Sequence, residues 1–240
     1  MTICIDRAGL VGDDGKTHQG IFDISYTRIA PGMTVGAPKD ENELQHMLFT
    51  AIRSGKPFAV RYPRGMALGV ELDAELKTVE IGKGEILSEG RDLMLLAYGS
   101  MVSVAQQAAQ ELAGHGISCG VANARFAKPL DRDLLRRIAG SVPRILTLEE
   151  HLEIGGFGSG VLEAFHAEGL PAEGLKVHAI PDIFVEHSPQ LQQRHNLKLD
   201  VEGVVQTALE LYPDLARVSS SGTASGDEGK KRKFAETVNW

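Results

Sequence analysis

An arginine, an aspartate and a histidine share one short glycine-rich stretch near the start of the chain. In residues 6–20, DRAGLVGDDGKTHQG, Arg7, Asp14 and His18 stand among four glycines. Glycines let a backbone turn sharply and approach a ligand closely. Arg7 can hold an anion, Asp14 can accept a hydrogen bond from a hydroxyl, and His18 can relay a proton near neutral pH. The stretch predicts a small-molecule site; the alternative is a turn held by its aspartates, with an exposed histidine.

A second pair of arginines stands at the end of an apolar run, in Arg61-Tyr62-Pro63-Arg64-Gly65. Pro63 forces Tyr62 to be extended, so a strand is expected to end there and Arg64 to project from the turn that follows. Even on an acidic protein, a local pair of arginines can bind a phosphorylated small molecule. The alternative is an ordinary surface arginine after a strand.

Apolar spacing defines the elements that must position these residues. The first block runs from Met1 to about Gly69. Its Asp40, followed three residues later by Glu43, predicts a helix start, and Gly55 ends that helix. Strands are predicted at Thr2–Ile5, Met33–Ala37 and Phe58–Val60. A block this small leaves sheet edges uncovered and buries too little surface to be stable alone.

The second block, from about Val79 to Leu215, alternates strands with helices. Such alternation with short connections predicts a mostly parallel sheet with helices on both faces. The predicted strands are Leu93–Tyr98, Ile117–Ala122, Arg144–Leu148 and Lys176–Ile180, and the predicted helices are Met101–Leu112 capped by Ser100, Asp131–Ala139, Ser159–Glu168 and Asp200–Tyr212.

These patterns divide the chain into four segments. Residues 1–70 form a partial first domain, 71–78 a linker and 79–216 a complete α/β domain. Residues 217–240 are polar and rich in glycine and serine, which predicts a disordered tail.

Composition restricts the class of protein. The net charge of −7 offers no broad basic face, so we expect no nucleic-acid partner. No apolar run is long enough to span a membrane, and the amino terminus does not resemble a signal peptide. Cys4 and Cys119 lie far apart and are predicted to be buried free thiols. Together these features predict a cytoplasmic protein.

Three separated motifs carry a family resemblance: DRAGLVGDDGKTHQG, APKDENEL at residues 37–44 and VRYPRG at residues 60–65. They resemble the 1-deoxy-D-xylulose-5-phosphate synthase family, which belongs to the transketolase-like thiamine diphosphate enzymes. The resemblance implies that the first block is the second half of a thiamine-pyrimidine-binding domain. It implies that the second block is a transketolase carboxy-terminal three-layer domain, with Tyr98–Ser100, Phe126–Asp131 and Glu149–His151 as matching motifs.

The resemblance also implies an activity. The family condenses pyruvate with glyceraldehyde 3-phosphate, releasing carbon dioxide and forming 1-deoxy-D-xylulose 5-phosphate, a precursor of isoprenoids, thiamine and pyridoxal. It implies that His18 and Asp14 are catalytic and that Arg7 and Arg64 bind the acceptor phosphate. The implied cofactors are thiamine diphosphate and Mg²⁺, and the implied partner is an amino-terminal half or a homodimer mate.

The chain departs from this family in two respects: it lacks the family's diphosphate-binding domain, and it lacks the glutamate that activates the aminopyrimidine ring of the cofactor, which lies upstream of the DRAG motif in the family. The magnesium-binding GDG motif does not occur, and no cofactor-binding or metal-binding residue is identifiable. We therefore expect an enzyme portion that is inactive without the amino-terminal half: the product of a truncated gene or a split subunit. The alternatives are a split subunit of another transketolase-like enzyme, of the 2-oxo acid dehydrogenase beta type, and a non-catalytic interaction module.

Two further features are expected to be structural. Residues 156–160, GFGSG, resemble a phosphate cradle before a helix, but Val161 replaces the third glycine of a dinucleotide motif. We interpret the run as tight packing of a helix on a strand. His151 follows two glutamates and is expected to have a structural or interface role.

Overall fold

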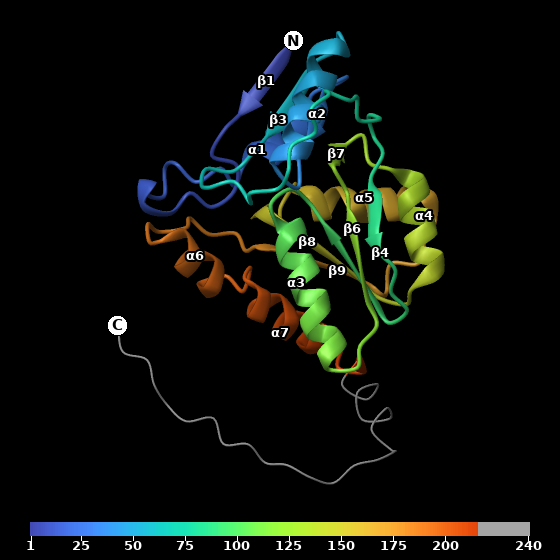
Figure 1. The fold of residues 1–240 in the computed structure, drawn as a ribbon. Helices are drawn as coiled ribbons and strands as arrows, with labels where there is room; N and C mark the ends of the chain where they lie inside the picture. The colour runs from blue at the N-terminus through green and yellow to red at the C-terminus, as the bar shows by residue number, and fades with distance from the viewer. Residues whose placement is uncertain (216–240) are drawn as a thin grey trace.

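The computed structural model describes residues 1–215, which form two β-sheets with helices around them (Figure 1). The predicted disordered tail at 217–240 lies outside the described residues. The chain starts in the smaller sheet and continues into the larger one, against which the last helices pack. The predicted α/β class with mostly parallel strands is confirmed.

The smaller sheet has the strand order β1-β3-β2-β7, with the first three strands parallel and β7 antiparallel. Its first-block elements are β1 (Thr2–Ile5), η1 (Gly12–Asp14), α1 (Asp23–Arg28), β2 (Thr34–Gly36), α2 (Glu41–Arg53) and β3 (Phe58–Arg61). Strand β7 (Phe126–Lys128) comes from the second block and pairs with β2. The β2 edge of the first-block strands is therefore paired with a strand of the second block.

The larger sheet has the order β4-β6-β5-β8-β9, in which β4 alone is antiparallel to its neighbour. Its strands are β4 (Glu85–Ser88), β5 (Leu93–Ala97), β6 (Cys119–Asn123), β8 (Ile145–Leu152) and β9 (Leu175–Ile180). The helices of this block are α3 (Met101–Gly114), α4 (Arg132–Ser141), α5 (Phe157–Glu168), α6 (Gln190–Asn196) and α7 (Val201–Leu211).

Central strand β5 shows how the layers form. Alternate residues point to opposite faces of a strand, so Leu93 and Leu95 join a core with α3 and α7, while Met94 and Leu96 join another with α4 and α5. Both cores also contain residues of the first block. The two blocks therefore pack against each other through shared apolar cores.

Two predicted helix starts have different outcomes. Asp40 caps α2 as predicted, because its carboxylate accepts from the backbone N–H of Glu43 at 2.7 Å. Ser100 precedes α3, but its hydroxyl does not cap the helix and instead donates to Glu150 at 3.1 Å. That capping prediction is wrong because a buried carboxylate lies within reach of the hydroxyl.

Other sequence expectations need correction. Cys4 is exposed rather than buried, because β1 is an edge strand of the smaller sheet. Ile52, on helix α2, is another exposed apolar residue. Elements α1, β4, β7 and α6 were not predicted. None of the helices in residues 1–215 combines the length and the apolar character needed to cross a membrane.

Candidate functional site

Arg7, Asp14 and Arg64 meet at one edge of the smaller sheet. Arg7 follows β1 and Arg64 follows β3, and these strands are parallel neighbours whose carboxyl ends share an edge. Asp14 Oδ2 accepts a hydrogen bond from Arg7 Nε at 3.2 Å and forms an ion pair with Arg64 Nη1. The structure thus brings three of the four predicted site residues together.

This cluster is open to solvent. The side chains of Arg7 and Arg64 are 45% and 50% exposed, and that of Asp14 is 23% exposed. Hydrogen bonds from Arg64 and then Arg7 lower the pKa of Asp14, so its carboxylate is ionised at neutral pH and can only accept hydrogen bonds. An anion arriving from solvent can reach both guanidinium groups without entering the core.

His18 lies on the same loop but outside this cluster. Its side chain is exposed, and Nδ1 lies 3.0 Å from the hydroxyl of Thr17. Its backbone N–H donates to Gly15 O at 3.1 Å, so the imidazole projects from a tight turn. The structure does not bring His18 into contact with Arg7, Asp14 or Arg64.

The glycine-rich loop is closed and internally braced. Gly9 and Gly20 exchange backbone hydrogen bonds at 2.7 and 2.8 Å, which fixes the two ends of the loop. A side chain at Gly20 would overlap Arg7 O, with its Cβ only 1.9 Å away. Inside the loop, buried Gln19 accepts from Val11 N at 2.8 Å. Sequence reasoning missed Gln19, since a polar residue in a loop gives no sign of burial.

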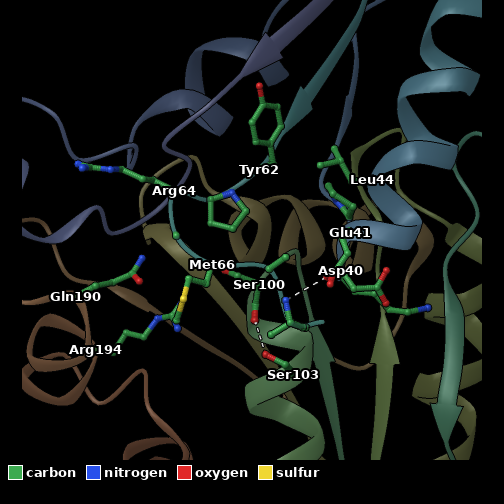
Figure 2. A pocket seen from close by; sticks show the side chains of 16 residues that line it. Asp40, Glu41, Leu44, Tyr62, Arg64, Met66, Ser100, Ser103, Gln190 and Arg194 are labelled. Carbon is green, nitrogen blue, oxygen red and sulfur yellow. Dashed lines mark hydrogen bonds between the residues drawn. The ribbon is translucent and has the colours of Figure 1, made fainter. Parts of the chain in front are cut away.

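A pocket of about 260 Å³ opens beside the cluster, between the starts of α2 and α3, the turn after β3, and α6 (Figure 2). Arg64 belongs to its wall, but its guanidinium points away from Ser100 and Met66 in this view. Arg194 reaches the pocket from α6 and is held by Glu150, whose Oε1 lies 2.5 Å from Arg194 Nε. The pocket therefore joins residues from both blocks.

Arg61, by contrast, is a buried structural residue. Its guanidinium donates to both oxygens of Asp23, from Nε at 2.8 Å and from Nη2 at 3.1 Å. Asp23 is the first residue of α1, a helix that contacts β2 and β7 of the smaller sheet. The pair ties α1 to the smaller sheet and leaves this arginine unavailable to a ligand.

The glycine run before α5 packs tightly, as predicted. A Cβ on Gly158 would lie 2.6 Å from Val177 Cγ1, so the helix could not approach β9 with a larger residue there. The helix N-terminus is occupied by Glu149, whose two oxygens accept from Phe157 N and Gly158 N at 2.6 Å each. Burial raises the pKa of Glu149 to about 7. A carboxylate of the chain therefore fills the place that a phosphate would take.

His151 is likewise part of the interior. Its Nδ1 donates to Leu152 O at 2.8 Å and its Nε2 accepts from Ser25 N at 3.4 Å, which assigns a neutral tautomer. Burial lowers the pKa of His151 and so favours the same neutral form. Because Ser25 belongs to α1, the contact links the two blocks.

The family resemblance implies thiamine diphosphate with Mg²⁺, whose binding needs side chains that can act as metal ligands. Holding the diphosphate with Mg²⁺ requires several oxygen ligands around the ion. Residues 1–215 contain no group of three or more His, Cys, Asp or Glu side chains that could hold a metal ion. Among the described residues, therefore, no cluster of such side chains forms a metal site by itself.

Comparison with known proteins matches both blocks. Residues 1–68 match the family model "Transketolase, pyrimidine binding domain", and residues 82–204 match "Transketolase, C-terminal domain". The chain is 50% identical over 204 residues to 1-deoxy-D-xylulose-5-phosphate synthase 1 of Geobacter sulfurreducens, covering 85% of this chain and 32% of that protein. The synthase of Aquifex aeolicus is also 50% identical over 204 residues, with the same two shares.

Solved structures agree at the level of the fold. A protein described as "Split gene transketolase, inactive beta4 tetramer" is 30% identical with a TM-score of 0.72, covering 88% of this chain and 67% of that one. Transketolase from Campylobacter jejuni is 22% identical with a TM-score of 0.63, covering 87% and 31%, and shows the fold alone.

The chain thus spans about a third of the length of the synthases that it matches. Since the C-terminal-domain model alone covers more than half of the chain, the protein belongs to the transketolase family, and within that family it resembles the 1-deoxy-D-xylulose-5-phosphate synthases.

Proposed function

We propose that this chain is the acceptor-binding portion of a 1-deoxy-D-xylulose-5-phosphate synthase. The complete enzyme would condense pyruvate with glyceraldehyde 3-phosphate, with loss of carbon dioxide, to give 1-deoxy-D-xylulose 5-phosphate. The observation that carries the proposal is the convergence of Arg7 and Arg64 on one exposed carboxylate, Asp14. The 50% identity to synthases of this name supports it and does not favour the 2-oxo acid dehydrogenase alternative.

In this proposal the two guanidinium groups bind the phosphate of glyceraldehyde 3-phosphate. A phosphate offers several charged oxygens, and two arginines can each donate to more than one of them. Both arginines are about half exposed, so the acceptor reaches them without opening the fold. Asp14 then keeps the arginines together and accepts from a hydroxyl of the acceptor.

His18 is the group proposed to move a proton. When the acceptor carbonyl is attacked, its oxygen gains charge and needs a proton, and imidazole can supply one near neutral pH. His18 is exposed on the Gly15 turn, so an acceptor arriving from solvent can reach its imidazole. Contact of His18 and Asp14 with the acceptor stays a proposal.

Thiamine diphosphate, when bound, supplies the carbanion chemistry of this reaction. The chain spans about a third of the synthases' length and residues 1–215 hold no cluster of three or more metal-ligating side chains, so we assign the binding of the diphosphate, with Mg²⁺, to a region corresponding to the rest of that length. That region, on a partner chain or a homodimer mate, would complete the site. A cytoplasmic location belongs to the same proposal.

The test is to complete the enzyme with a matched part. The 240-residue chain is combined with the remaining portion of the Geobacter sulfurreducens synthase, and product formation from pyruvate and glyceraldehyde 3-phosphate is measured. We expect activity from the mixture and a loss of roughly 10²–10⁴-fold in turnover for His18→Ala. His115→Ala, an exposed histidine after α3, is the control. An assembled but inactive mixture, or equal activity of the two variants, would contradict the proposal.

A further inference from the structure

The glycine-rich loop is held from outside by helix α6 of the second block, which lies beside it (Figure 1). The contact is made by Gln193, whose side chain is only 2% exposed. Its Oε1 accepts from Gly12 N at 2.9 Å, and its Nε2 donates to Gly12 O at 3.3 Å and to Glu186 O at 2.9 Å. One amide side chain therefore satisfies both backbone groups of one loop residue.

The backbone of Gly12 determines the conformation of the loop around η1. Its φ of +74° is a left-handed conformation that glycine adopts without strain, and a Cβ there would approach Gln190 N to 3.2 Å. Gly12 also opens the single turn η1, which ends at Asp14. Fixing the peptide groups of Gly12 therefore fixes the turn that places the Asp14 carboxylate between Arg7 and Arg64.

Helix α6 is itself anchored, so it can act as a fixed support. Arg194, the next residue, pairs with buried Glu150 at the end of the larger sheet. Glu150 packs so closely on the loop that a Cβ on Gly9 would lie 2.4 Å from its Oε2. At the start of the helix, Gln190 donates to Leu10 O. The loop thus rests on the larger sheet and α6 at three successive points.

We infer that Gln193 is a positioning residue, by which the C-terminal domain sets the geometry of the acceptor-phosphate site through the backbone of Gly12. It touches neither the arginines nor Asp14 and acts through the loop. The identity of the ligand rests on the proposed function. The hydrogen bonds by which Gln193 fixes Gly12 do not depend on that proposal. The task of the C-terminal domain in this site is therefore to position the loop that carries Asp14.

The test uses the 240-residue chain and three variants. Gln193→Met has nearly the same length and cannot hydrogen-bond to Gly12, while Gln193→Asn keeps the amide but is too short to reach. Gln192→Met is the matched control, because Gln192 is exposed on the same helix and bonds only to Asn196 in the described contacts. The two readouts are the titration of the Asp14 carboxyl by carbon NMR and the binding of inorganic phosphate.

Both readouts report the site rather than global stability. In both Gln193 variants we expect the pKa of Asp14 to rise toward that of an ordinary aspartate, because its arginine contacts loosen. We expect inorganic phosphate to bind roughly three- to tenfold more weakly, the range for one group that must be ordered on binding. Gln192→Met should match the parent in both.

The possible outcomes distinguish the positioning role of Gln193 from the proposed phosphate site at Arg7 and Arg64. If the Gln193 variants fold and titrate like the parent, the positioning role is wrong, whatever phosphate does. If the parent chain does not bind phosphate but Asp14 still responds to Gln193, the positioning role stands and the proposed phosphate site fails. If one Gln193 variant is unfolded, the other is decisive by the same two readouts.

Discussion

Arg61 and Arg64 are three residues apart and have opposite environments. The side chain of Arg61 is 4% exposed and donates to both oxygens of Asp23, whereas that of Arg64 is 50% exposed and shares Asp14 with Arg7. The strand and the turn after it explain the difference. Arg61 is the last residue of β3 and points into the contact with α1, while Pro63 ends the strand before Arg64.

Arg61 therefore stabilises the fold, whereas Arg64 is accessible to an anion from solvent. A buried ion pair gives up hydration on both sides, so the loss of one partner leaves an uncompensated charge in the interior. An exposed pair gives up little and is screened by water, so another anion can replace its partner at small cost. Two arginines that look alike in sequence therefore predict different consequences on substitution.

The largest effect is expected at the buried pair. Asp23→Asn keeps the shape of the side chain but leaves the Arg61 charge without its counterion, which should lower the free energy of unfolding by about 3–5 kcal/mol. Urea unfolding followed by circular dichroism measures it. Asp14→Asn is the matched control and should leave the midpoint nearly unchanged. Equal losses in the two variants would show that burial does not distinguish the pairs.

A second buried carboxyl, Glu149, gives a smaller effect with a defined pH dependence. Its pKa is raised by burial from 4.5 to about 7, so the folded protein holds this proton where the unfolded chain has released it. This group therefore makes the free energy of unfolding fall as pH rises between those two values. Glu149→Gln should remove that slope.

The same variant should also lower the free energy of unfolding by about 1–3 kcal/mol. A glutamine has one acceptor oxygen, so either Phe157 N or Gly158 N is left without a partner. Glu153→Gln, on an exposed glutamate just after β8, is the control. Urea titrations of both variants and the parent between pH 4.5 and about 7 measure the free energy of unfolding. Parallel pH profiles for the parent and Glu149→Gln would contradict the raised pKa of Glu149.

Sequence predicted the local parts of this account better than the contacts between the blocks. The strand before Tyr62 and the capping of α2 by Asp40 follow from neighbouring residues, and both were found. The burial of Arg61 depends on Asp23, 38 positions away, on a helix too short to give a periodic signal.

The candidate site divides in the same way. The glycines, the acid and the arginines could be recognised from residue types, because turns and charges are local features. The hold of Gln193 on Gly12 spans 181 positions, and the pairing of β7 with β2 also joins the two blocks. Such pairings have no local signature in a single sequence.

The smallest effect is expected at the exposed cluster. Asp14 holds Arg7 and Arg64 together, so Asp14→Asn should let the two guanidinium groups separate, while the loss of an anion partly offsets that effect. Inorganic phosphate should then bind about two- to fivefold more weakly to the 240-residue chain, the range for one exposed ion pair. An NMR titration of the arginine Nε–H signals measures the affinity. Tighter binding than in the parent would mean that Asp14 competes with the phosphate instead of holding the arginines in place.

The most direct test of the central claim compares two acceptors in the completed enzyme. If Arg64 binds the acceptor phosphate, Arg64→Ala should raise the KM for glyceraldehyde 3-phosphate roughly tenfold or more, because a charge-assisted contact is lost. Arg7→Ala should behave alike. With unphosphorylated glyceraldehyde, both variants should match the parent. Equal losses with the two acceptors would contradict the account, since the arginines would then support the fold of the loop and not the binding of phosphate.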